Sequence, residues 1–155
     1  MNTILGAVGV LLVLILVYRQ LPSRRPRTLG VHAGRLADCP ATPNCVCTQA
    51  TDPEHRIEPI HFEGNPSTGF QRVQSTLATM PRLKVISAEF PYLHAEARTP
   101  LLQFIDDVEI LVDEDSSTIH FRSASRVGHS DLGVNRERME QFRRLFHQTP
   151  AGPPP

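Results

Sequence analysis

Arginine, serine and acidic side chains with the chemistry of an anion-binding or catalytic site gather between residues 122 and 138, in the stretch RSASRVGHSDLGVNRER. Guanidinium groups bind phosphate and carboxylate groups through paired hydrogen bonds. Ser, Asp and Asn side chains hold backbone turns in place. We predict these ligands for an anionic group: Arg122, Ser123, Ser125, Arg126, Asp131, Asn135, Arg136 and Arg138.

Arg136 and Arg138 stand at the start of a predicted helix, where cations oppose the helix macrodipole. An anion bound there removes the conflict, because free backbone N–H groups and guanidinium groups both bind it. The anion is either internal, from Asp131 or Asp107, or external, such as a phosphate, a carboxylate or a lipid headgroup. An internal carboxylate is the favoured partner.

Three acidic residues precede this stretch and support it: Asp106, Asp107 and Glu109. Strand alternation places Asp106 on the same face as apolar neighbours, so we expect it to be buried and hydrogen-bonded to Ser125, or to lie in a polar pocket. The other two acids face Arg122 and Arg126. This pattern predicts a ladder of ion pairs on an exposed sheet face, in preference to anion ligands.

The same stretch holds the ingredients of a serine hydrolase, namely Ser123, Ser125, His129 and Asp131. A small hydrolase that uses Ser125, His129 and Asp131 is therefore an alternative. The sequence has no G-x-S-x-G elbow, so we assign no catalytic residues and favour a protein that is not an enzyme. No cofactor motif is present, and the spacing of the cysteines does not match a zinc site, so we predict no cofactor and no metal.

The elements that must position these residues follow from periodicity and breakers. Strands are predicted over 57–62, 83–90 and 92–99, and a hairpin over 101–126 with its turn at 113–118. Helices are predicted from Asn65 and Pro66 to Met80, and from Arg136 to His147. The order β-α-β-β-β-β-α predicts an α+β fold, an antiparallel sheet with both helices packed on one face.

The hairpin register follows from its apolar residues, which must share one face. This pairs Val112 with Ile119, Ile110 with Phe121, and Val108 with Ser123. The opposite face then pairs Glu109 with Arg122.

The first residues predict a membrane anchor that precedes the domain. Residues 4–18 form an uninterrupted apolar run, and residues 1–37 hold five arginines and no acid. We favour an uncleaved transmembrane helix over a cleaved signal peptide, because no basic stretch precedes the run and no clear cleavage site follows it. The predicted division is an anchor over 1–21, a basic linker over 22–37, one domain over 38–148 and a disordered Pro-rich tail over 149–155.

Two features of the sequence favour different sides of the membrane for the domain. Arginines after the span favour the cytoplasm by the positive-inside rule. Cys39 and Cys45 favour an oxidising compartment, because they could close a disulfide, although Cys47 is then left over. The part after residue 37 holds eleven basic and sixteen acidic residues, so we predict no nucleic-acid partner.

Three separated blocks, CPATPNCVCTQA (39–50), FIDDVEILVD (104–113) and RSASRVGHSDLGVNRERME (122–140), resemble a bacterial and plastid family, domain of unknown function 1499. The resemblance covers about residues 36–147. It implies a small extracytoplasmic or membrane-tethered domain with no assigned activity, and it favours export.

We therefore predict a single-pass, membrane-tethered binding or accessory module. Its Arg/Ser/Asp-rich corner would recognise an anionic small molecule, a lipid headgroup or an envelope component. The alternatives are the small hydrolase and a purely structural or protein-interaction domain. The sequence identifies no protein partner.

Overall fold

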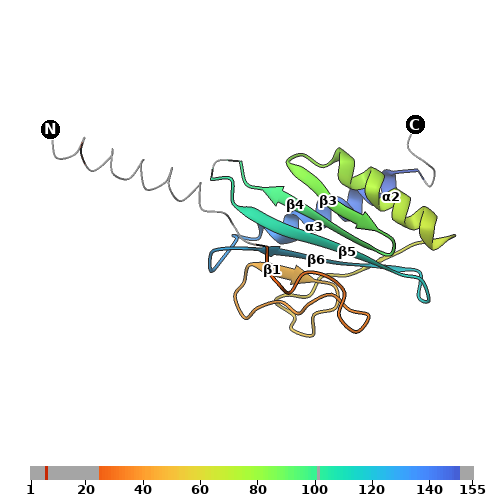
Figure 1. The fold of residues 1–155 in the computed structure, drawn as a ribbon, viewed down its shortest axis with the longest axis horizontal. Helices are drawn as coiled ribbons and strands as arrows, with labels where there is room; N and C mark the ends of the chain where they lie inside the picture. Colours follow the sequence, from red (N-terminus) through yellow and green to blue (C-terminus); the bar gives the residue numbers. More distant parts are fainter. Residues whose placement is uncertain (1–5, 7–24, 101, 151–155) are drawn as a thin grey trace.

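The computed structural model describes residue 6, residues 25–100 and residues 102–150 (Figure 1). The predicted anchor over 1–21 lies outside these residues except for Gly6, as does most of the predicted tail over 149–155. Within the described part of the chain, no helix is long and apolar enough to cross a membrane.

Helix α2 (Pro66–Thr79) begins where the sequence predicts. Asn65 is the N-cap, and its side-chain oxygen accepts a hydrogen bond of 2.8 Å from the backbone N–H of Ser67. The helix stops just before Pro81, and Phe70 and Leu77 on its apolar face enter the core.

Four antiparallel strands follow α2 as a meander, so each strand lies beside the next one in the chain. They are β3 (Leu83–Glu89), β4 (Tyr92–Arg98), β5 (Ile105–Asp113) and β6 (Thr118–Ser125). The predicted hairpin register is confirmed, since Val108 pairs with Ser123, Glu109 with Arg122, and Val112 with Ile119. Burial of the apolar face leaves no other register.

Two short strands extend the sheet on the other side of β6. They are β1 (Cys45–Cys47) and β2 (Ile60–His61), and both pair with β6. The sheet order is β1-β6-β5-β4-β3, with β2 off this path. The strands predicted from the sequence do not include β1, because three residues are too few to show alternation.

Helix α3 (Val134–Gln148) packs beside α2 on one face of the sheet, which gives the α+β arrangement (Figure 1). Its residues Met139, Phe142 and Phe146 join the same core as Phe121 of β6. The rings of Phe121 and Phe142 meet edge to face, with centroids 5.9 Å apart. The residues that the structure describes therefore form an antiparallel sheet of six strands with two long helices, α2 and α3.

The opposite face of the sheet is also buried at β4, β5 and β6, which corrects the prediction of a solvent-exposed ladder. Asp107 is 1 % exposed and Glu109 is 0 % exposed. Residues of the segment before β1 contact this face, since the backbone N–H of Gly30 donates to Glu109 at 2.8 Å. Leu36, which the sequence places in a linker, is buried as well. Local alternation cannot show such a cover, because it comes from a distant part of the chain.

Candidate functional site

Arg126 lies at the centre of a buried ion-pair network on the sheet face away from the helices. Its guanidinium donates to both carboxylate oxygens of Asp107, at 2.8 and 2.6 Å, and to Glu96 at 2.6 Å. The His94 ring lies 2.7 Å from Asp107. Burial alone would raise the pKa of Asp107, but the hydrogen bonds from Arg126 and His94 outweigh it and hold that pKa below its usual value. The positive charge of Arg126 is therefore paired with the carboxylates of Asp107 and Glu96 within the fold.

Arg122 belongs to a second buried group on the same face. It donates to Glu109 at 2.9 Å, and the Tyr92 hydroxyl donates to the other oxygen of that carboxylate at 2.8 Å. Burial and the neighbouring Glu109 charge raise the pKa of Tyr92, so its phenol stays protonated. With the N–H of Gly30, Glu109 has three partners. This carboxylate therefore neutralises Arg122 within the fold.

On the helix side, Asn135 joins β6, α3 and the loop before β1. Its side-chain oxygen accepts from Ser123 at 2.6 Å, and its amide donates to Ser125 and to the carbonyl of Asn44, each at 3.0 Å. It is 0 % exposed. Arg138 also donates to this Asn135 oxygen, at 2.6 Å. These contacts fix the start of α3 on the sheet.

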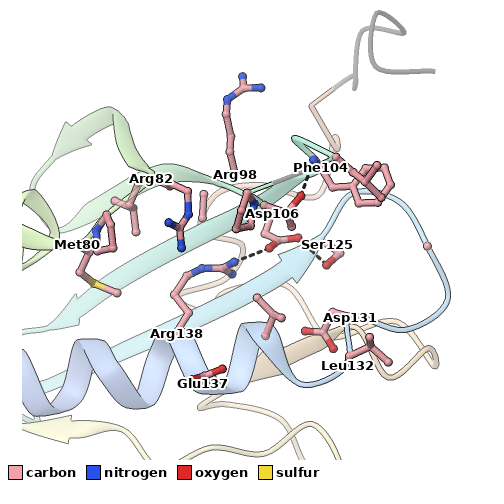
Figure 2. A pocket seen from close by; sticks show the side chains of 18 of the residues that line it. Met80, Arg82, Arg98, Phe104, Asp106, Ser125, Asp131, Leu132, Glu137 and Arg138 are labelled. Atoms are coloured by element: carbon pink, nitrogen blue, oxygen red, sulfur yellow. Dashed lines mark hydrogen bonds and ion pairs between the residues drawn. The ribbon is translucent and has the colours of Figure 1, made fainter. Parts of the chain in front are cut away.

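Asp106 is the acid that pairs with Arg138. One carboxylate oxygen accepts from Arg138 at 2.6 Å and the other from the Ser125 hydroxyl at 2.6 Å (Figure 2). The expected burial of Asp106 and its hydrogen bond to Ser125 are both present.

The start of α3 binds an internal carboxylate. Gly133 is the N-cap, with φ of +83°, a left-handed conformation that glycine adopts without strain. Asp131 accepts from the backbone N–H groups of Gly133 at 3.0 Å and Asn135 at 2.8 Å. Arg136 turns away and donates to the backbone carbonyls of Glu54 and Arg56. The anion expected at this helix start is therefore Asp131.

The predicted anion ligands do not form one corner. Strand alternation sends Arg122 and Arg126 to one face of β6, and Ser123 and Ser125 to the other. Arg136 lies against the loop before β2. The prediction that all these guanidinium groups converge is wrong, because the sheet itself separates them.

The geometry gives the hydrolase alternative no support. Ser125 donates its hydroxyl proton to Asp106 and accepts from Asn135. His129 is exposed, and the described residues show no hydrogen bond between it and Ser125. The nucleophile and base of such a site need that contact.

A pocket with a volume of about 590 Å³ lies on the helix side of the sheet, where β5 and α3 begin (Figure 2). The end of α2, the connection from β4 to β5 and the loop before α3 surround it. Apolar side chains that include Met80, Leu83, Phe104 and Val134 line it. Its polar side carries Asp106, Ser125 and Arg138. The pocket thus joins an apolar wall to a buried, neutral ion pair.

Arg82 adds a positive charge to this pocket that the ion pair does not balance. Its guanidinium points into the pocket from the β3 side (Figure 2). Its backbone carbonyl accepts from the N–H of Arg98 at 3.0 Å, which fixes the position at the start of β3. In the part of the chain that the structure describes, no hydrogen bond or ion pair engages its side chain. Arg82 was not among the predicted site residues, because a lone arginine after Pro81 carries no motif.

Cys39 and Cys45 form a disulfide, with Cα atoms 5.6 Å apart. Cys47 is a free thiol and is buried, and this burial raises its pKa. The disulfide closes the loop just before β1.

Comparison with known proteins gives one match. A family model described as protein of unknown function, DUF1499, matches residues 35–146. No curated protein and no solved structure matches the chain.

Proposed function

The chain belongs to the DUF1499 family of proteins of unknown function, and we propose that its domain binds a small amphipathic anion in the pocket described above. One observation carries the proposal: an apolar pocket of about 590 Å³ into which the Arg82 guanidinium points (Figure 2). Pockets for small ligands have volumes of roughly 300–1,000 Å³ and place a few polar groups among apolar walls.

The apolar wall favours a hydrocarbon body in the ligand. Met80, Leu83, Phe104 and Val127 lie along it. Each buried CH₂ group contributes about 0.8 kcal/mol, so a six-carbon chain gains up to about 5 kcal/mol before the entropic cost of binding. A purely polar ligand would leave this gain unused.

Arg82 favours an anionic group at the polar end of the ligand. The charge of Asp106 is balanced by Arg138, at 2.6 Å, so this acid does not cancel the charge of Arg82. Asp131 is engaged with backbone N–H groups. Glu137 is an exposed acid on the α3 side of the lining. These charges favour an anionic group that lies against Arg82 and away from α3.

The proposal includes a membrane tether through residues 4–18 and a domain outside the cytoplasm. The apolar run supports the tether, and the Cys39–Cys45 disulfide supports an oxidising compartment. Alkaline phosphatase fused to the C-terminus tests the second point, because it is active only outside the cytoplasm. An inactive, stable fusion would contradict this placement.

Isothermal titration calorimetry tests the binding proposal, with the full chain in lipid nanodiscs and empty nanodiscs as the blank. Hexyl phosphate is the probe, and hexanol is the matched neutral compound. We expect hexyl phosphate to bind more tightly than hexanol. We expect Arg82→Ala to weaken hexyl phosphate binding about 5- to 30-fold, since a hydrogen bond to a charged group contributes about 1–2 kcal/mol at a partly exposed site.

Glu137→Gln is the matched control, because it removes a charge of the opposite sign from the same lining. We expect it to retain or strengthen hexyl phosphate binding. Equal affinity for hexyl phosphate and hexanol, or an Arg82→Ala variant that binds like the wild type, would contradict the proposal.

A further inference from the structure

We infer that the mouth of this pocket docks on the surface of a lipid bilayer, so that an amphipathic anion enters it from the membrane. The inference rests on the proposed function and adds where the ligand comes from. The carrying observations are an exposed apolar rim, the positive charges on one side of the pocket, and the point at which the chain enters the domain.

Four apolar residues of the pocket lining are exposed, and we call them the apolar rim: Leu102, Val127, Leu132 and Val134. Leu132 is 94 % exposed, while the other three are 43, 40 and 39 % exposed, in the order Leu102, Val127 and Val134. A leucine side chain is stabilised when it moves from water into an apolar phase. Apolar residues grouped around one opening mark an interaction surface.

Positive side chains stand on the β3–β4 side of the pocket, opposite the acids Asp131 and Glu137 on the α3 side (Figure 2). Arg82 and Arg98 line the same pocket. Arg25 lies nearby, because Glu96 is 3.8 Å from Arg25 and 3.7 Å from Arg98. Basic residues near an anionic membrane surface are attracted to it. Apolar side chains next to arginines fit a bilayer with anionic headgroups better than they fit a second copy of the same surface, because the arginines of the two copies would repel each other.

The sequence before Arg25 places the rim close to the proposed tether. Residue 18 ends the apolar run, and seven peptide steps separate it from Arg25. A fully extended chain covers at most about 3.6 Å per step, so Arg25 stays within about 25 Å of the end of that run. The turn between β5 and β6 lies at the other end of β5, roughly 30 Å away at about 3.3 Å per residue. The rim is therefore the end of the domain that the tether brings to the membrane.

Site-specific fluorescence tests this inference in the full chain, reconstituted in vesicles of phosphatidylcholine and phosphatidylglycerol. Leu132→Cys carries an environment-sensitive nitrobenzoxadiazole label. Glu114→Cys carries the same label at the β5–β6 turn, where the side chain is exposed, and serves as the matched control. The native cysteines do not compete for the label, because Cys39 and Cys45 are bonded and Cys47 is buried.

We expect the label at residue 132 to shift to the blue and to be quenched by spin-labelled lipid, and the label at residue 114 to show neither change. A label at 132 that reports water overturns the inference. Equal quenching at both positions also overturns it. A blue shift at 132 without lipid quenching assigns the rim to a protein contact and overturns it as well.

The docking proposal and the ligand-binding proposal are tested by different measurements, so either can be overturned without the other. Quenching is measured without added ligand, whereas the calorimetry measures hexyl phosphate binding. Selective quenching at residue 132 in a protein that does not bind hexyl phosphate supports docking and overturns the ligand proposal. Hexyl phosphate binding with an aqueous label at residue 132 overturns docking alone.

Discussion

Replacement of Arg126 by methionine tests the buried network most sharply. The Arg126 side chain is 3 % exposed and holds Asp107 and Glu96 through contacts of 2.6 Å. Methionine keeps much of the apolar stem and removes the charge. Removal of one partner from a buried ion pair costs about 3–5 kcal/mol, because the other charge stays buried without compensation. We expect Arg126→Met to lower the free energy of unfolding by about this amount near pH 7.

The pH dependence of this loss has a definite sign. In the wild type the pKa of Asp107 is lowered, so the network stabilises the fold above the usual carboxyl pKa of 3.8 and loses that contribution as the pH falls through the folded value. In Arg126→Met, burial raises the pKa of Asp107 and its strongest opposing contact is gone. Protonation then relieves the unpaired charge, so the deficit shrinks between about pH 7 and about pH 4.

Urea unfolding of the full chain, followed by circular dichroism at several pH values, measures this deficit. Arg25→Met is the matched control, since Arg25 contacts the same Glu96 at 3.8 Å with a side chain that is 58 % exposed. We expect the control to change stability by less than about 1 kcal/mol. An Arg126→Met deficit below about 1 kcal/mol, or one that does not change with pH, would refute the reasoning.

Three further predictions concern the start of α3 and the disulfide before β1, each measured by urea unfolding. Asn135→Ala leaves the buried Ser123 and the Ser125 hydroxyl without an amide partner, and we expect a loss of about 2–3 kcal/mol; an unchanged midpoint would contradict this. Gly133→Ala places a Cβ in a left-handed conformation, with open space around it, and we expect a loss of about 1 kcal/mol from backbone strain alone; a gain in stability would contradict it. The Cys39–Cys45 disulfide restricts the unfolded chain, so we expect its reduction to lower the free energy of unfolding by about 2 kcal/mol. An unchanged free energy of unfolding after reduction would contradict a stabilising role for this disulfide.

The sequence predicted the central hairpin and both helices because their information is local. Val108, Ile110 and Val112 occupy alternate positions of the strand, and only one pairing with β6 buries them all. Asn65 and Pro66 mark the start of α2 through capping chemistry alone. These features need no knowledge of distant residues.

The buried second face could not be predicted in this way. The residue types of Glu109 and Arg122 favour an exposed ladder, and their cover comes from residues far away, such as Gly30. Their register was nevertheless right, so the error concerned the environment and not the pairing. Burial of a charged pair depends on tertiary contacts that alternation does not encode.

The apolar wall of the pocket and Arg82 were not predicted, for a related reason. Asp106, Ser125 and Arg138 were all identified from the sequence. Met80 lies at the end of α2 and Arg82 just before β3, so both come from another part of the chain. Only the packing of α2 and α3 on one face brings them to the same opening. The predicted anion ligands were chosen because they are close in the sequence, so they included side chains from opposite faces of β6.

A crystal structure of the protein with hexyl phosphate tests the central claim most directly. We predict the phosphate against the Arg82 guanidinium, and the hydrocarbon chain along the wall formed by Met80, Leu83 and Phe104. A bound hexyl phosphate that lies elsewhere on the domain, or a pocket that stays empty at ligand concentrations that saturate the calorimetric signal, would contradict the account.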